Sequence, residues 1–241
     1  FIPSGSLNKR KSRKQSSFYC SRHFRSRPIL HSSRFPKPLT TFRLLPVFLD
    51  YGFYRSAILA AQSLTRLAGY ENDPFSPNLP PYLAYISYGA YFQPWVETAS
   101  QTHDLPELLL YSLIRQESHF EGHAKSSAGA NGLMQIMPET GAQIALEIGF
   151  PANFSQDDLS VPYYSLELGS TYLARQIQLF DGDLYAALAA YNGGPGNAIN
   201  WKETSGSDPD VLLGNITYQE TRTYIRSIVE NYAAYVKIYG Q

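Results

Sequence analysis

A carboxylate at the end of an apolar helical run is the first residue that could do chemistry. A helix turns by about 100° per residue, so the segment "HDLPELLLYSLIRQESHF" places Glu117 in one narrow stripe with apolar side chains. The apolar members of this stripe are Leu110, Leu113 and Ile114. Arg115 points nearly the opposite way. The stripe predicts that Glu117 lies on the buried face of its helix.

Burial changes what a glutamate can do. An ionised carboxylate is costly to bury, and desolvation raises the pKa of a buried acid by as much as ~3–5 pH units. An acid that keeps its proton near neutral pH can donate it to the leaving oxygen of a glycosidic bond. We therefore predict that Glu117 is a general acid. The alternative is a structural Glu that accepts hydrogen bonds at a helix end or pairs with an arginine.

The next segment, "EGHAKSSAGANGLMQIMP", has side chains that suit a sugar. Its glycines allow tight turns and a close approach of a ligand to the backbone. Ser126 and Gln135 supply neutral donors and acceptors, and the Met and Ile side chains supply soft apolar walls. A sugar needs hydrogen bonds without strong charge, so the segment predicts one wall of a saccharide groove. Plain core packing of "GLMQIM" is the alternative.

Other residues could bind a metal, but their patterns are incomplete. His119 and His123 have the i, i+4 spacing of a metalloprotease helix, yet the Glu is displaced and Gly122 opposes helix continuation. The segment "DGD" at 181–183 lacks the other ligands of a calcium loop, and we expect it to cap a helix. The single Cys20 excludes an intramolecular disulfide. We expect no metal and no cofactor.

Four motifs follow one another in the order and spacing of a known enzyme family. They are Glu117-Ser118, "GLMQIMP" (132–138), "AAYNGGPG" (189–196) and "ETRTYI" (220–225). Together they resemble the motifs of the soluble lytic transglycosylases, which cleave peptidoglycan, and the resemblance covers about 94–237. Any one of these motifs alone would be a weak signal, whereas four in order are specific.

The resemblance implies a lysozyme-like, mainly helical fold with a saccharide groove and Glu117 as the lone catalytic carboxylate. In that family the acid protonates the oxygen between N-acetylmuramic acid and N-acetylglucosamine. It then acts as a base toward the muramyl 6-hydroxyl, which closes a 1,6-anhydro ring. The resemblance implies substrate-binding roles for Ser126, Gln135, Met137, Tyr191, Asn192, Glu220 and Tyr224. It also implies peptidoglycan strands as the partner and a location outside the cytoplasm.

A single carboxylate is consistent with this chemistry. Ordinary glycosidases use two, about 5–5.5 Å apart for retention of configuration or ~6.5–9.5 Å apart for inversion. A reaction whose nucleophile is the substrate's own hydroxyl needs only one. Glu121 and Glu220 are the candidates for a second group, and chain order leaves hydrolysis open. The alternatives are therefore a hydrolytic muramidase, a glycan-binding module without turnover, and a scaffold that binds another protein.

Two positions depart from the family pattern. Gly193 stands where the family usually has Ala, and Asn131 stands where Ser is common. We expect Gly193 to loosen the turn without removing Tyr191, whose polar tip we expect to face the groove. Neither departure removes a chemical group that the mechanism needs.

Charge divides the chain into two parts. Residues 1–49 hold eleven of the twenty Lys and Arg residues and no Asp or Glu, so the remainder carries nine basic and twenty acidic residues. The acidic part is a poor general nucleic-acid binder. Residues 1–42 are predicted to form a disordered basic arm, with an anionic-surface arm or a transit peptide as alternatives. Neither a signal peptide nor a membrane-spanning run is visible.

The rest of the chain must position these groups. Residues 43–81 are predicted to form one or two helices that end at Gly69, followed by a proline-rich linker. Residues 82–241 have helical apolar spacing and no period-2 strand, which predicts an all-α catalytic domain. We expect helices near 105–119, 132–148, 162–180, 183–191, 195–202 and 218–239. Asp104 should cap the first of these, and the apolar stripe of the last should be mainly core.

Overall fold

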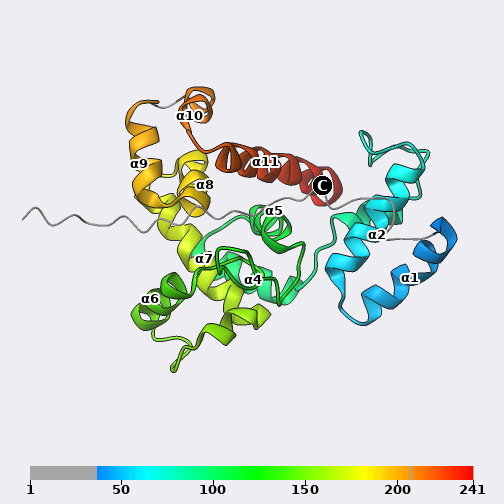
Figure 1. The fold of residues 1–241 in the computed structure, drawn as a ribbon, viewed down its shortest axis with the longest axis horizontal. Helices are drawn as coiled ribbons and strands as arrows, with labels where there is room; N and C mark the ends of the chain where they lie inside the picture. The colour runs from blue at the N-terminus through cyan, green and yellow to red at the C-terminus, as the bar shows by residue number, and fades with distance from the viewer. Residues whose placement is uncertain (1–36, 207, 241) are drawn as a thin grey trace, which may run out of the picture.

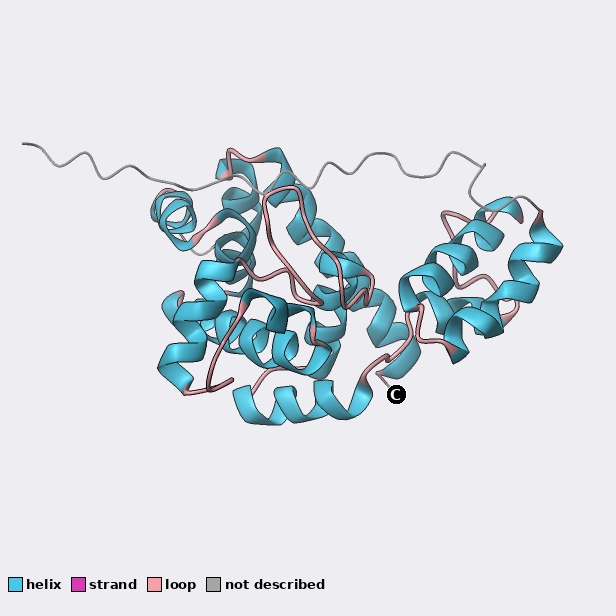
Figure 2. Cartoon of the chain, turned by 60° about the horizontal axis from the view of Figure 1, so that its bottom comes forward, coloured by secondary structure: helices cyan, strands magenta, loops and turns pink. Residues whose placement is uncertain are grey.

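The computed structural model describes residues 37–206 and 208–240. Figure 1 shows this part of the chain as an assembly of helices, with α5 near the middle and α11 running beside it to the C-terminus. Apart from helices, the described residues contain two isolated β-bridges, which join Asn131 to Lys125 and to Ile136. Figure 2 accordingly shows helices joined by loops. The expected all-α fold is confirmed for the described residues.

The helix bounds set the frame of the molecule. The α-helices are α1 Pro38–Asp50, α2 Tyr54–Leu67, α3 Pro81–Ser87, α4 Gln93–His103, α5 Glu107–Ser118, α6 Pro138–Ile148, α7 Pro162–Leu179, α8 Leu184–Gly193, α9 Pro195–Glu203, α10 Pro209–Asn215 and α11 Gln219–Tyr239. A 3-10 helix spans Gln156–Ser160. The expected helices are therefore found, except that 132–148 is helical only from Pro138.

The first described helix begins earlier than predicted. α1 starts at Pro38, inside the range 1–42 that was expected to be disordered. A proline at the first helical position fixes φ in advance and lacks an N–H that would have no partner there. The prediction was wrong for residues 38–42, and the rest of the predicted arm, up to residue 36, lies outside the described residues.

The start of α5 also differs from the prediction. Asp104 does not cap α5, because it ends the preceding helix α4 with a left-handed conformation at φ 51. The residue before α5 is Pro106, whose side chain makes no capping hydrogen bond. Asp is among the few residues that tolerate the left-handed region, so the same side chain serves a helix end as readily as a helix start.

The segment 119–137 is a loop rather than the start of a helix. Gly132 has φ 82 and Gln135 has φ 49, and both values interrupt an α-helix. A Cβ at Gly132 would overlap the carbonyl oxygen of Leu159, so this position requires glycine for space as well as for its dihedral angle. α6 then begins at Pro138.

α5 lies at the centre of the main hydrophobic core. The predicted stripe is confirmed, since its three apolar residues are fully buried and Glu117 is 7% exposed. Arg115, on the opposite face, is buried as well. Its guanidinium lies 4.2 Å from the ring centre of Tyr88 and donates hydrogen bonds to the Ser87 carbonyl and to Asn231. α5 is therefore enclosed on nearly all sides, which holds its C-terminal turn in place.

α11 packs one face against this core. Tyr224, Ile225 and Ile228 are buried, as expected. The prediction that its apolar stripe is mainly core was wrong beyond Ile228, because the four other members are between 36% and 41% exposed. These are Val229, Tyr232, Val236 and Tyr239. A single helix can bury only the face that meets its neighbour, and the stripe is wider than the contact with α5.

The helices α1 to α3 form a smaller core of their own. Leu45, Ala60 and Leu83 are buried in it, and Figure 2 shows these helices as a lobe beside the others. Aromatic contacts join this lobe to the main body, where Tyr54 stacks on Tyr91 with ring centres 4.2 Å apart. None of the described helices has the length and apolar character needed to cross a bilayer.

Candidate active site

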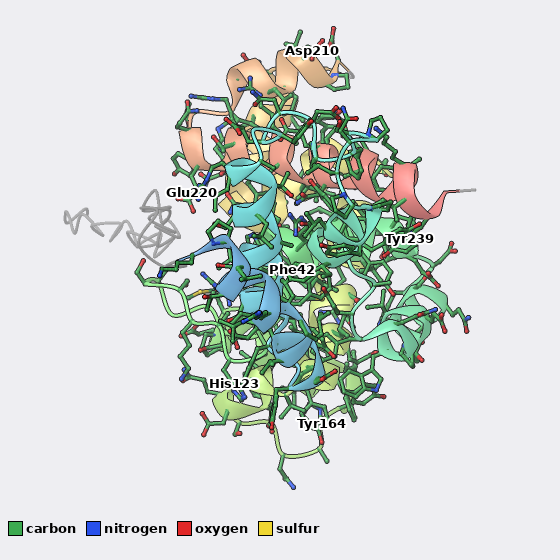
Figure 3. The ribbon with its side chains drawn as sticks, turned by 90° about the vertical axis from the view of Figure 1, so that its right-hand side faces the viewer. Phe42, His123, Tyr164, Asp210, Glu220 and Tyr239 are labelled. Carbon is green, nitrogen blue, oxygen red and sulfur yellow. The ribbon has the colours of Figure 1, made fainter. Side chains whose placement is uncertain are left out.

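Four segments of the chain converge on one pocket of about 250 Å³. They are the last turn of α5, the loop 119–137, the end of α8 and the first two turns of α11. The lining residues are Gln116, Glu117, Ser126, Ala130, Gln135, Asn192, Gln219, Glu220, Thr223 and Tyr224. Figure 3 shows Glu220 at the start of α11, well apart from His123 on the loop. The residues that line this one cavity therefore come from four segments that are distant in sequence.

Glu117 is the most enclosed acid of the pocket. It lies in the last turn of α5 and is 7% exposed. The hydroxyl of Tyr224 donates a hydrogen bond to Glu117 Oε1 at 2.7 Å, and Tyr224 is itself buried. Burial disfavours the charged form of a carboxyl group, while the hydrogen bond fixes the direction of its oxygens. The side chain therefore has the setting of an acid that can exchange a proton with a bound ligand.

The loop presents a hydrogen-bond acceptor to the pocket. Gln135 Nε2 donates to the carbonyl oxygens of Ala124 at 3.0 Å and Gly132 at 2.9 Å. These two bonds use both amide hydrogens, and the buried Oε1 has no partner among the described residues. Ser126 holds the loop closed, because its Oγ accepts the Ala130 N–H at 2.9 Å. Gln135 is thus oriented to accept an N–H or O–H from a ligand.

The end of α8 presents a hydrogen-bond donor to the pocket. Thr221 Oγ1 donates to Asn192 Oδ1 at 2.7 Å, which leaves Asn192 Nδ2 as the group that this side chain offers to the pocket. Glu220 from the next helix also lines the cavity. Donors and acceptors on different walls are what a ligand with several hydroxyl and amide groups requires.

Two predicted binding residues do not line the pocket. Tyr191 is 1% exposed, and its hydroxyl donates to the Met134 carbonyl at 2.9 Å rather than facing the cavity. α8 is apolar around its whole circumference, so this tyrosine is packed behind the pocket wall and contacts Tyr172. Met137 precedes α6 and is partly buried. The binding roles predicted for both residues stay predictions.

Sequence reasoning missed four lining residues. They are Gln116, Ala130, Gln219 and Thr223. One signal could have found two of them, because Gln219 and Thr223 are four residues apart and adjoin Glu220 and Tyr224 on the same helical face. The other two depend on how the loop folds over the end of α5, which no spacing rule predicts.

The departure at Gly193 has a physical reason. A Cβ built there would lie 2.9 Å from the ring of Trp201, so the indole occupies the space of an alanine methyl group. Trp201 is nearly buried and packs edge-to-face on Tyr218. The expectation of a looser turn is not supported, because α8 continues through Gly193 and α9 begins two residues later.

The histidines and aspartates beside the motifs have other environments. Burial, with smaller contributions from Arg115 and Arg55, lowers the pKa of His119 to about 3, so this residue stays neutral at physiological pH. The expectation for the "DGD" segment is confirmed, because Asp183 caps α8 by accepting the Ala186 N–H. Among the described residues, no group of three or more His, Cys, Asp or Glu is arranged to hold a metal ion.

Comparison with known sequences gives consistent matches. Residues 94–212 match the model of the transglycosylase SLT domain. The soluble lytic murein transglycosylase of Escherichia coli K12 is 32% identical over 138 residues, which are 56% of this chain and 21% of that protein. The membrane-bound lytic murein transglycosylase D of the same organism is 29% identical over 166 residues, or 64% and 35% of the two chains. The chain thus spans between a fifth and about a third of these relatives.

Solved structures share the fold. An inactive mutant of the lytic transglycosylase Slt from Pseudomonas aeruginosa, with one glutamate replaced by glutamine, superposes with a TM-score of 0.70 and 27% identity. The match covers 86% of this chain and 32% of that one. The 70 kDa soluble lytic transglycosylase of Escherichia coli superposes with a TM-score of 0.72 and 21% identity, over 86% and 32% of the two chains. The expected lysozyme-like, mainly helical fold is confirmed.

Proposed function

Residues 94–212 belong to the transglycosylase SLT domain family, and from that premise we propose that this chain is a lytic transglycosylase that cleaves the glycan strands of peptidoglycan. The bond that it cleaves would be the β-1,4 linkage between N-acetylmuramic acid and N-acetylglucosamine. The observation that supports this most directly is a buried acid, Glu117, that opens onto a pocket lined by neutral donors and acceptors.

Glu117 would act twice in the reaction. As an acid it donates its proton to the glycosidic oxygen, and the bond between that oxygen and the muramyl C1 breaks. As a carboxylate it then accepts the proton of the muramyl 6-hydroxyl, whose oxygen bonds to C1 and closes the 1,6-anhydro ring. The proton count balances, because the acid regains the proton that it gave. No water enters the products, and the nucleophile is held close by the sugar itself.

The other lining groups would bind and orient the sugar. Gln135 Oε1 would accept from a hydroxyl or acetamido N–H, and Asn192 Nδ2 would donate to an acetamido or hydroxyl oxygen. Tyr224 would hold the Glu117 carboxyl in line with the scissile bond. We retain Ser126 and Glu220 as pocket contacts. The binding roles predicted for Met137 and Tyr191 are kept as part of the proposal, although neither residue lines the pocket.

A second acid in the same pocket favours one alternative. Glu220 lines the cavity with Glu117, and a pair of carboxylates is what a hydrolytic muramidase would use to activate water. Two considerations favour the transglycosylase. The family model and the matched relatives are transglycosylases, and a nucleophile supplied by the substrate's own 6-hydroxyl makes a second carboxylate unnecessary. A glycan-binding module without turnover remains the third candidate.

Product mass separates these three functions. Purified sacculi are digested with the intact chain, and the soluble fragments are analysed by mass spectrometry. A transglycosylase releases muramyl ends that weigh one water less than the hydrolytic ends. Hydrated ends alone would identify a muramidase, and no release with retained binding to sacculi would identify a binding module. Glu117→Gln should abolish release while it preserves binding.

The proposal also assigns a location and a domain plan. Peptidoglycan lies outside the cytoplasm, so we place the chain there. Residues 82–241 would be the catalytic domain, although α3 at its start packs in the smaller core with α1 and α2. Residues 43–81 would be a helical segment with its linker, preceded by the basic arm. Proteolysis of the folded chain tests this plan, since cleavage should concentrate at 71–80 and leave an active C-terminal fragment.

A further inference from the structure

At the start of α11, the side-chain amide of Gln219 lines the pocket in a fixed orientation. Gln219 and Thr223 line the cavity on consecutive turns, each next to a family motif residue. Both are exposed, so they lie at the rim of the pocket rather than at its floor. The mechanism proposed above uses neither of them. Their position suits contacts with parts of the substrate that extend away from the sugar ring at the cleavage point.

Arg222 determines which end of the Gln219 amide faces outward. The Arg222 guanidinium donates to the Ile216 carbonyl and to Gln219 Oε1. A guanidinium has no acceptor, so its partner on Gln219 must be the oxygen. Gln219 Nε2 donates to Thr223 Oγ1 at 3.4 Å, and Thr223 Oγ1 donates to the Gln219 carbonyl at 3.0 Å. This closed set of bonds leaves one N–H of Gln219 as a donor for a ligand.

Glu220 supplies the complementary group beside it. Its carboxylate lines the same pocket from the adjacent position, and a carboxylate has about four lone-pair sites with which to accept hydrogen bonds. A donor next to an acceptor matches a peptide unit, which presents one carbonyl oxygen and one N–H. A hydroxyl carries its donor and its acceptor on one oxygen atom, whereas a peptide unit carries them on two separate atoms. The inner walls already hold an acceptor at Gln135 and a donor at Asn192 for the sugar.

We propose that Gln219, oriented by Arg222, is a specificity-determining residue that donates a hydrogen bond to a carbonyl oxygen of the peptide stem on the glycan strand. The inference rests on the proposed function, because it assumes a peptidoglycan substrate. It makes stem-bearing glycan the preferred ligand. Arg222 is a positioning residue that acts through Gln219.

The experiment compares binding of two glycan fragments of equal length. One carries its peptide stems, and the other has had them removed with an amidase. Binding is measured with the intact chain carrying Glu117→Gln, so that neither fragment is cleaved. In that background Gln219→Glu keeps a partner for Arg222 but removes the donor. It should weaken binding of the stem-bearing fragment about tenfold, as expected for one or two hydrogen bonds, and change binding of the bare fragment less than about twofold.

Three further variants separate the donor from other causes. Gln219→Met removes the amide without adding charge and should give the same loss as Gln219→Glu. Arg222→Met should give a smaller loss, because Gln219 can then turn its oxygen outward. Arg226→Met removes a cation from an exposed position one turn further along α11, and it should leave the binding of both fragments unchanged. Circular dichroism of each variant checks the fold.

Two results would overturn the inference. If binding of both fragments is weakened equally, Gln219 is a general sugar contact. If binding of both is unchanged, Gln219 has no role in substrate binding. Failure of the proposed function looks different, since it would appear as absent or hydrated products from the chain with its native Glu117, whatever the fragments show.

Discussion

The hydroxyl of Tyr224 donates a 2.7 Å hydrogen bond to Glu117 Oε1 and thereby joins two helices that are far apart in sequence. Glu117 lies in the last turn of α5, and Tyr224 lies in the second turn of α11. Both side chains are nearly inaccessible to solvent. The same two helices also meet where Tyr111 stacks on Tyr235 and where Arg115 donates to Asn231. Because these contacts hold α11 against α5, the phenol fixes where the carboxyl oxygens point without adding a charge. The orientation of the acid is thus a property of the core.

Tyr224→Phe should lower kcat on sacculi by about ten- to a hundredfold, the range expected when a hydrogen bond to an ionisable group is lost. The ring stays in place, so KM should change little and the thermal midpoint should move by only a few degrees. Steady-state kinetics with soluble strands measures both constants. A loss confined to KM would make Tyr224 a binding contact and would contradict its orienting role.

Glu117→Gln should reduce turnover about a thousandfold or more while the protein becomes as stable as before or more stable, because a buried acid is replaced by a neutral amide. The matched control is Glu121→Gln, since Glu121 lies four residues further on and does not line the pocket. It should keep near-normal turnover. Release of fragments from sacculi measures the first effect, and thermal unfolding measures the second. Equal loss in both variants would remove the special role of Glu117.

Local periodicity predicted the acid but not its surroundings. Glu117 was found because Leu110, Leu113 and Ile114 share its face, and that signal lies within about two turns of one helix. The burial of Arg115 gave no such signal, because it depends on Tyr88 and Asn231 from other elements. Tertiary packing made α5 a central helix, and a stripe on one face cannot indicate what covers the other.

The conformations of turn residues explain where the other sequence-based predictions differ from the structure. The pattern at Asp104 fits a helix start and a left-handed helix end equally well, and the end of α4 decided between them. The run "GLMQIM" has apolar spacing compatible with a helix, yet the positive φ of Gly132 and Gln135 makes it a loop. The site residues followed motif order and mostly reached the pocket, whereas Tyr191 turned to the Met134 carbonyl because α8 is buried on all sides.

Gly193→Ala should destabilise the protein by about 1–3 kcal/mol, because the added methyl group meets the Trp201 ring at 2.9 Å in a packed region. Trp201→Phe in the same chain should recover part of this loss, because a smaller ring leaves room for the methyl group. Chemical denaturation of the two single variants and the double variant gives their coupling energy. Gly196→Ala is the control, since nothing lies within 4 Å of its added Cβ. Additive effects in the double variant would contradict the steric explanation.

The half-buried His119 should make the fold sensitive to mild acid. Its pKa is lowered from 6.5 to about 3 in the folded chain by burial, so between these values the unfolded chain binds one more proton than the folded chain. Stability therefore rises with pH across that window and is lost as pH falls below about 6.5. Between pH 7.5 and 5.5 this residue should lower the unfolding free energy by about 1.4 kcal/mol.

The variant His119→Asn tests this, because asparagine tolerates the left-handed conformation at φ 54. Its unfolding free energy should fall by about 1.4 kcal/mol less than that of the unmodified chain over the same interval. Urea denaturation at the two pH values measures the difference, and the exposed His123→Asn serves as the control that should behave as the unmodified chain does. If His119→Asn keeps the full pH dependence, some other group carries the acid sensitivity and the neutral state assigned to His119 is wrong.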